Sequence, residues 1–311
     1  MAKIFITGIT GFLGSNIAEY LINEEHDVTA IYRPSSSRER CNQYYSSVNW
    51  ILQDDLGDWQ DAVIKSSPDV IVHSAWLGVG HLERDDWNIQ VANIDFLKSL
   101  LFIASKSEAS KFISLGSQAE YGIFEGTIDE EYPTSPTEAY GCVKVVCSEL
   151  VKQFCNYHKI DWFWLRLFSF FGKGEADNWL IPSMVKRMFT GTEMDFTAGE
   201  QKYSYLYVSD LALAVNNITT KNGVSGIYNI SGKNVLKLKT LITDIRDHIN
   251  PSFQLNFGNL PYRKNQPMHM QGNSSKFVKE FGEFDVTDFK SAMLNVLDDL
   301  KQKITHNNEG I

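Results

Sequence analysis

Tyr140 and Lys144 lie four residues apart in the segment YGCVK, within a stretch whose pattern is typical of a helix. This spacing places both side chains on one helix face, so we expect the Lys144 ammonium near the phenol. A nearby cation favours phenolate and lowers a tyrosine pKa that is normally about 10, which suits proton transfer near neutrality. Ser117 follows an expected strand in SLGSQAEYG, and its hydroxyl can bond a substrate oxygen. We therefore interpret Ser117, Tyr140 and Lys144 as a catalytic set at the carboxyl ends of strands.

A glycine pattern connects the first expected strand, 3–7, to the first expected helix. In TGITGFLG, the first glycine permits a tight turn, the second lets the backbone approach a pyrophosphate, and the third allows close helix packing. The spacing is GxxGxxG rather than GxGxxG, and glycines also occur in turns for steric reasons. The strand–turn–helix context favours a dinucleotide site. Its predicted contacts are Gly8, Gly11, Phe12, Leu13 and Gly14.

The end of the second expected strand, 28–32, indicates which dinucleotide binds. An acid there suits the ribose of NAD, whereas an arginine suits the 2′-phosphate of NADP. The strand ends at Tyr32 and is followed by Arg33, a serine run, Arg38 and Arg40. Guanidinium and hydroxyl groups bind phosphate well, so NADP(H) is favoured, while NAD remains possible. A solvated basic loop is the alternative interpretation.

A third strand is expected at 50–52, followed by Asp55 and Leu56. These two residues could hold the edge of an adenine, and a plain loop acid is an equal alternative.

Strands alternate with helices along most of the chain. Further strands are expected at 70–73, 112–115, 162–167, 205–208 and 227–230, and a last helix at 289–300. This alternation predicts an α/β fold of the Rossmann type, a doubly wound parallel sheet covered on both faces. We expect a dinucleotide-binding domain at 1–170 with returning segments at about 203–235. Residues 171–202 and 236–311 would form a smaller, mostly C-terminal substrate region.

Composition excludes several functional classes. The chain has 311 residues and a formal net charge of −9, which argues against partnership with nucleic acid or anionic lipid. No apolar run approaches the roughly 18 residues of a membrane-spanning helix. The first strand begins almost at once, so we expect no signal peptide and a cytoplasmic protein. We expect no metal site and reduced thiols, because metal-ligand spacing is absent from Cys41, Cys142, Cys147 and Cys155.

With these motifs the chain resembles the extended short-chain dehydrogenase/reductase family, in its branch of nucleotide-sugar epimerases, dehydratases and reductases. The resemblance covers essentially the whole chain and includes several further segments. These are DVIVHSAW (69–76), QVANIDF around Asn93, LRLFSFFG (165–172), WLIPSMV (179–185), GEQKYSYLYVSD (199–210) and YNISG (228–232). It implies that Ser74 and Ala75 join Tyr140 and Lys144 in holding the cofactor.

The resemblance also implies a substrate site. Trp179, Leu180 and Ile181 would border the nucleotide, although core packing is an alternative for the first two. Arg263 in PYRKNQPM would meet the diphosphate. At two further substrate positions the chain departs from the family, because Ser169 stands where relatives often have Asn and Tyr203 where they often have Arg. These departures imply a rearranged pocket in which Arg263 or nearby lysines carry more of the charge pairing.

The residues after Ser117 indicate which of the family's reactions to expect. Dehydratases of this family place an acid two residues after that serine, where this chain has Ala119. Glu120 is one residue late and would face the other side of an extended strand. Dehydration is therefore not expected. An NADPH-dependent 4-ketoreductase is favoured, similar in layout to the synthases of abequose-, paratose- and fucose-type deoxysugars that supply O-antigen and other surface polysaccharide.

Two alternatives stay open. One is an NAD-dependent nucleotide-sugar 4-epimerase, which keeps its cofactor bound throughout the reaction. The other is a non-catalytic dinucleotide-sensing protein, which would not need a proton donor such as Tyr140.

A homodimer is also expected from the resemblance. Relatives pair through the helices equivalent to 87–104 and 138–157, which are rich in apolar residues here. The alternative is that these residues only cover the sheet.

Overall fold

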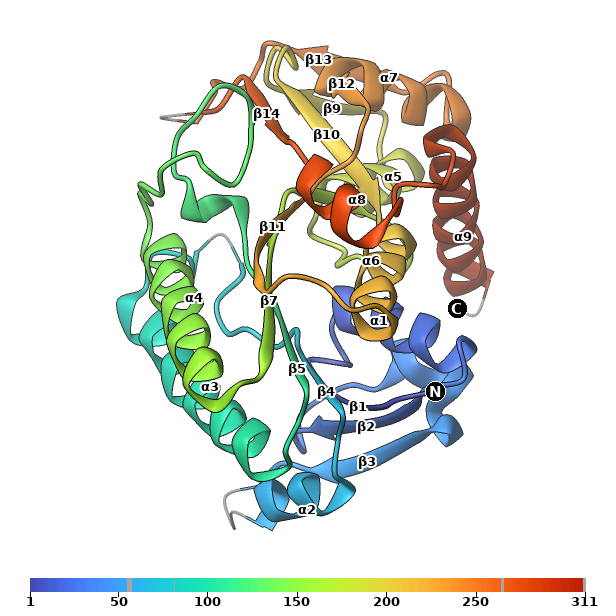
Figure 1. Ribbon diagram of the computed structural model, residues 1–311. Helices are drawn as coiled ribbons and strands as arrows, with labels where there is room; N and C mark the ends of the chain where they lie inside the picture. Colours follow the sequence, from blue (N-terminus) through green and yellow to red (C-terminus); the bar gives the residue numbers. More distant parts are fainter. Residues whose placement is uncertain (55–57, 81, 264–265, 310–311) are drawn as a thin grey trace.

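The structure is a computed structural model that describes residues 1–54, 58–80, 82–263 and 266–309, with the backbone alone described for 306–309. Seven of its strands form one sheet (Figure 1). These strands are β1 (Lys3–Thr7), β2 (Asp27–Tyr32), β3 (Val48–Leu52), β4 (Val70–His73), β5 (Lys111–Leu115), β7 (Asp161–Leu167) and β11 (Gly226–Ile230).

The order of the main sheet is β11-β7-β5-β4-β1-β2-β3, and every pairing in it is parallel. The chain builds outward from β1 in one direction and then, from β4, in the other. Ile4 of β1 therefore pairs with Val28 on one side and Val70 on the other. Such a switch point opens a crevice at the carboxyl ends of the two central strands. The predicted doubly wound α/β fold is confirmed.

Helices cover both faces of this sheet. They are α1 (Phe12–Asn23), α2 (Asp58–Ser66), α3 (Trp87–Lys106), α4 (Ala139–His158) and α6 (Val208–Thr220), with the short 3-10 segments η1 (Glu39–Ser47) and η2 (Gln118–Glu120). One core cluster joins the sheet to α1 and α6, and another joins it to α2, α3 and α4. Figure 1 shows α3 and α4 lying side by side along one face.

Local sequence explains the central elements. All residues of β4 (VIVH) and β5 (KFISL) are buried, as expected of parallel strands covered on both faces. Helix α3 begins after Asp86, whose carboxylate accepts hydrogen bonds from the amides of Asn88 and Ile89. Helix α4 ends where Lys159 adopts a left-handed conformation with φ 59°.

The rest of the chain forms a second, smaller layer. A second sheet has the order β12-β10-β14-β6, with β8 beside β10, and a two-stranded sheet pairs β13 with β9. The strands are β6 (Gly126–Ile128), β8 (Ser169–Phe171), β9 (Glu193–Phe196), β10 (Lys202–Tyr207), β12 (Val235–Lys237), β13 (Gln254–Phe257) and β14 (His269–Gly272). The accompanying helices are α5 (Leu180–Thr190), α7 (Leu238–Ile249), α8 (Ser275–Phe281) and α9 (Phe289–Glu309). Met184, Ile242 and Val296 belong to the core cluster of this layer.

The segment 203–235 divides between the two sheets. Strand β11 joins the main sheet beside β7, whereas β10 pairs with β8, β12 and β14 in the second sheet. The alternation of buried and half-buried residues along β10 explains this, because it fits a sheet covered more fully on one face than on the other. Across the described ranges, we find no helix long and apolar enough to cross a membrane.

Candidate active site

The glycine turn lies between β1 and α1. Gly8 has φ +74°, and a Cβ on it would lie 2.6 Å from the amide nitrogen of Ala75. A Cβ on Gly14 would lie 2.1 Å from the carbonyl oxygen of Gly8. In the described chain no side chain caps the first turn of α1 after Gly11, so its backbone amides are available to an anion. The turn therefore fits the pyrophosphate of a dinucleotide, with Phe12 and Leu13 in the first turn of α1.

The segment after β4 lies against this turn, as the contact of Gly8 with Ala75 shows. The amide of Ala75 donates to Thr7 Oγ1 at the end of β1, 3.2 Å away. The structure thus brings the predicted cofactor residues Ser74 and Ala75 to the same crevice as the glycines. The other predicted residues of this kind, Asp55 and Leu56, lie outside the described residues.

Near the end of β2, the arginine that is held by neighbouring side chains is Arg38 rather than the predicted Arg33. Arg33 is exposed. Arg38 lies among three aromatic rings, with its guanidinium carbon 4.5 Å from the ring centroid of Tyr32, 5.1 Å from Tyr45 and 5.9 Å from Trp50. Its Nη1 also donates to the Tyr45 hydroxyl at 2.6 Å. Sequence spacing could not show this aromatic cage, because its members come from β2, η1 and β3.

Ser117 follows β5 and caps the short segment η2. Its amide donates to Glu120 Oε1 at 2.8 Å, and its hydroxyl accepts from the amide of Ala119 at 3.2 Å. Glu120 is fully buried and also receives Trp164 Nε1 at 2.8 Å and Arg166 Nε at 2.7 Å. The expectation that Glu120 faces the other side applied to an extended strand. The segment is instead the 3-10 turn η2. Its carboxylate turns inward and anchors the backbone of Ser117.

Tyr140 and Lys144 lie in the first turns of α4, and both are buried. The Ser117 hydroxyl interacts with the Tyr140 phenol and acts to lower its pKa. Lys144 Nζ lies 5.7 Å from the centroid of the Tyr140 ring and donates to the carbonyl of Leu115 at 2.6 Å. The predicted catalytic set is therefore brought together at the ends of β5 and α4.

The charges in this set differ from the expected ones. Burial raises the pKa of Tyr140, and the leading opposing influence is the Arg84 guanidinium rather than Lys144. Burial lowers the pKa of Lys144 to about 7, with Glu120 acting in the opposite direction. Lys144 is itself desolvated and donates to Leu115, so its expected lowering of the Tyr140 pKa stays a prediction.

Two residues beside Tyr140 were not found from sequence. The Arg84 guanidinium carbon lies 4.2 Å from the centroid of the Tyr140 ring. Trp76 meets the same ring edge-on at 6.0 Å and takes Lys144 Nζ over its face at 3.4 Å. Both come from the chain between β4 and α3, where no periodic pattern signals a contact with α4.

The predicted substrate residues form two groups. Gln266 Nε2 donates to the Tyr203 hydroxyl, and Arg263 Nε donates to Gln266 Oε1 at 3.4 Å, so Tyr203 and Arg263 share one polar cluster. Ser169 lies on β8 opposite Tyr205 of β10.

The other group is at the start of α5. Trp179 precedes the helix and is 49% exposed, and Leu180 packs at the edge of the core. Ile181 is only 2% exposed and belongs to the core, so its expected place beside the nucleotide is wrong.

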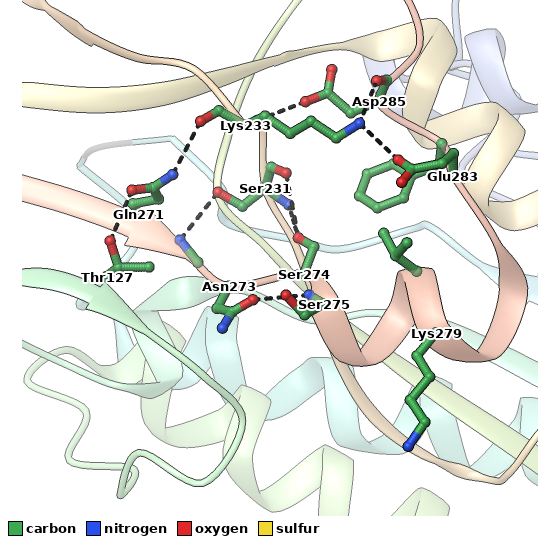
Figure 2. A pocket seen from close by; sticks show the side chains of 14 residues that line it. Thr127, Ser231, Lys233, Gln271, Asn273, Ser274, Ser275, Lys279, Glu283 and Asp285 are labelled. Carbon is green, nitrogen blue, oxygen red and sulfur yellow. Dashed lines mark hydrogen bonds and ion pairs between the residues drawn. The ribbon is translucent and has the colours of Figure 1, made fainter.

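A separate hollow of about 490 Å³, whose lining includes none of Ser117, Tyr140 and Lys144, lies where the end of β11, the end of β14 and α8 meet. Figure 2 shows its side chains bonded mainly to one another. Ser231 accepts from Gly272, Ser274 donates to the Ser231 carbonyl, and Lys233 pairs with Glu283 at 2.7 Å. The hollow therefore lies where the end of β11, from the main sheet, meets β14 of the second sheet. In the described residues, no group of His, Cys, Asp and Glu side chains could hold a metal ion.

Two known proteins that act on nucleotide-linked deoxysugars, by their names, match this chain over most of its length. The chain is 24% identical over 279 residues to a dTDP-6-deoxy-L-talose 4-dehydrogenase (NAD(+)) of Aggregatibacter actinomycetemcomitans, covering 87% of this chain and 99% of the relative. It is 25% identical over 303 residues to a CDP-abequose synthase of Salmonella muenchen, covering 94% and 97%.

Solved structures show the same fold. A UDP-N-acetylglucosamine 4-epimerase from Methanobrevibacter ruminantium, in complex with UDP-N-acetylmuramic acid, superimposes with a TM-score of 0.87 at 21% identity. The match covers 97% of this chain and 99% of the epimerase.

The model of the NAD dependent epimerase/dehydratase family matches residues 4–231, a span that includes the glycine turn, Ser117, Tyr140 and Lys144. This is the family that the sequence motifs resemble. The chain belongs to the NAD dependent epimerase/dehydratase family, whose relatives act on nucleotide sugars.

Proposed function

We propose that this chain is an NADPH-dependent reductase of a nucleotide-linked 4-keto-6-deoxy sugar, in deoxysugar and surface polysaccharide biosynthesis. The observation that carries the proposal is the interacting pair of Ser117 and Tyr140, both buried with Lys144 at the carboxyl end of β5. A hydroxyl and a phenol in this arrangement can orient a carbonyl and protonate it.

The residues divide the work as follows. The bound dinucleotide supplies the hydride that adds to C4 of the keto sugar. Ser117 orients the carbonyl by donating to its oxygen. Tyr140 gives its proton to that oxygen as the alcohol forms, and the resulting phenolate is reprotonated from solvent. Lys144 would hold the nicotinamide ribose, and the turn from Gly8 to Gly14 would hold the pyrophosphate.

The surroundings of Glu120 support reduction over dehydration. A dehydratase needs a carboxylate that is free to remove a proton from the sugar. Glu120 is committed to Arg166, Trp164 and the amide of Ser117. Its carboxylate therefore has a structural task.

The end of β2 supports NADP(H) over NAD. Arg38 is fixed among three aromatic rings there, with Arg33 exposed beside it, and guanidinium groups suit a 2′-phosphate. The named relatives point to related chemistry, because one is a 4-dehydrogenase and another is a synthase of abequose.

A 4-epimerase is the second candidate, favoured by the structural match to an epimerase. It would use the same three residues with NAD retained. A non-catalytic dinucleotide sensor has no need of the complete Ser–Tyr–Lys set.

Titration of the purified protein with NADPH and NADH, followed by nicotinamide fluorescence, tests these alternatives. A preference for exchangeable NADPH, together with its oxidation by a 4-keto-6-deoxy nucleotide sugar, supports the reductase. Tightly retained NAD moves the epimerase to first place, and absence of turnover with every nucleotide sugar supports the sensor. Tyr140→Phe should keep dinucleotide binding and remove most turnover. Retained turnover would contradict the role of Tyr140 as proton donor.

A further inference from the structure

The Tyr140 ring is surrounded by four residues from three parts of the chain: the segment between β4 and α3, the turn after β5, and α4. Its phenol interacts with Ser117, which acts to lower its pKa. The edge of Trp76 meets the ring at an interplanar angle of 81°, and the guanidinium of Arg84 covers a face at 4.2 Å. Lys144, one turn along α4, has its Nζ at 5.7 Å from the ring centroid.

The lysine is not directed at the phenol. Lys144 Nζ is 2.6 Å from the Leu115 carbonyl and 3.4 Å from the centre of the Trp76 ring. Burial also lowers its pKa to about 7, so its positive charge is partly lost at neutral pH. Arg84 places a second cation against Tyr140, and a guanidinium group does not lose its proton in proteins.

Arg84 is fastened to the same turn of α4 that carries the tyrosine. Its Nε lies 2.8 Å from Oε2 of Glu138, two residues before Tyr140. Its carbonyl accepts from the amide of Tyr140 at 2.8 Å. The next residue, Asp85, accepts from the amide of Ala139 at 3.0 Å. The residues that carry the guanidinium and the phenol are thus joined by an ion pair and two hydrogen bonds.

We propose that Arg84 is a positioning residue for the proton transfer: its guanidinium holds the Tyr140 ring against Ser117 and stabilises the negative charge that the phenol carries once its proton has left. This inference rests on the proposed role of Tyr140 as proton donor. A planar, permanently charged group lying over an aromatic ring is attracted to the ring face, and more strongly when the ring is a phenolate.

Two carboxylates also act on the Tyr140 phenol. Glu138 and Glu120 both raise its pKa, whereas Arg84 lowers it. Glu138 is paired with Arg84 and Glu120 with Arg166. Removing Arg84 therefore leaves Glu138 unopposed at close range, and the Tyr140 phenol should ionise at a higher pH.

The test compares Arg84→Gln, Arg84→Lys and Arg246→Gln with the unaltered protein. Arg246 is a matched control, because it pairs with Asp247 at 2.6 Å and its side chain is 25% exposed, the same fraction as that of Arg84. Ionisation of Tyr140 is followed by phenolate absorption, as the difference between each protein and its Tyr140→Phe counterpart. The pH profile of kcat/KM for NADPH oxidation is measured in parallel.

Arg84→Gln should raise the pH of Tyr140 ionisation by about one unit, a tenfold change in the acid dissociation constant. The alkaline limb of the kcat/KM profile should move by the same amount. Arg84→Lys should retain part of the effect, and Arg246→Gln should leave both curves in place. An Arg84→Gln protein that folds and shows the parental ionisation of Tyr140 overturns the proposal, as does an equal shift in Arg246→Gln.

The absorption measurement needs no turnover. If no nucleotide sugar is a substrate, the proposed function fails while the titration still decides the role of Arg84.

Discussion

The Glu120 carboxylate lies 2.8 Å from the backbone amide of Ser117, so a buried acid holds the serine that interacts with Tyr140. The same carboxylate forms an ion pair with Arg166, whose side chain is 4% exposed. One side chain thus links the interior of the main sheet to the turn on which the proposed chemistry depends.

Glu120→Gln should therefore damage both stability and activity. The substitution leaves the Arg166 guanidinium buried without its counter-charge, a change that typically costs about 3–5 kcal/mol of unfolding free energy. Denaturant unfolding should show this loss, with a fall in kcat in the protein that remains folded. Glu131→Gln, at an exposed position in the loop after β6, is the control. Equal stability of the two variants would contradict the structural role.

Gly14→Ala should disrupt the dinucleotide site. The added Cβ would lie 2.1 Å from the Gly8 carbonyl, and backbone atoms on both sides cannot yield cheaply. Overpacking of this kind costs about 1–3 kcal/mol. We expect the affinity for NADPH to fall by at least about tenfold, measured by nicotinamide fluorescence. Gly226→Ala, whose Cβ would have its nearest neighbour at 3.6 Å, should bind NADPH normally, and similar affinities for both variants would count against this geometry.

Glu175→Gln should change how stability depends on pH. Burial raises the pKa of Glu175 to about 8 from its usual 4.5, and one of its carboxyl oxygens is buried with no hydrogen-bond partner among the described residues. Between these two pH values the folded chain keeps a proton that the unfolded chain has lost. This residue's contribution to stability therefore falls as pH rises through the interval, at up to about 1.4 kcal/mol per pH unit, and then levels off.

Thermal unfolding of the parent and of Glu175→Gln across this pH interval measures the effect. The variant should gain stability relative to the parent as pH increases. A Glu39→Gln control at an exposed site should run parallel to the parent. Parallel curves for Glu175→Gln as well would refute a neutral buried carboxyl.

A homodimer through α3 and α4 stays a prediction that the surface supports. Phe102 on α3 is 47% exposed, and Val146 and Leu150 on α4 are 48% and 38% exposed. Leu150→Glu should turn a dimer into a monomer in sedimentation velocity, because it places a charge in an apolar contact. Val224→Glu, at an exposed valine in the loop before β11, should leave the assembly unchanged. A parent protein that sediments as a monomer would remove the proposal.

The main sheet and the catalytic set could be predicted because their signals are local. Buried runs such as VIVH in β4 identify parallel strands, and the spacing of Tyr140 and Lys144 places them on one helix face. The second sheet could not be predicted in the same way. Strands such as β6 and β8 have three residues each, too few for a periodic pattern, and their partners are distant in sequence.

The details of the site were also beyond sequence. The direction of the Glu120 side chain depends on the helical turn of η2. An extended strand at this position would point the side chain to the opposite side. Arg84 and Trp76 meet Tyr140 only because the loop before α3 folds back onto α4. The aromatic cage of Arg38 arises in the same way, from rings on separate elements.

The pairing of β6 with β14 affects how the protein can fold while it is synthesised on the ribosome. Gly126 pairs with Met270, 144 residues later in the chain. Until that late strand has emerged, β6 and β10 present open edges to the cell, and open strand edges invite pairing with other chains. The main sheet has all its strands once β11 has emerged, whereas the second sheet closes only after β14. Chains truncated before β14 should therefore bind chaperones and aggregate, although they carry every residue of the Ser117–Tyr140–Lys144 set.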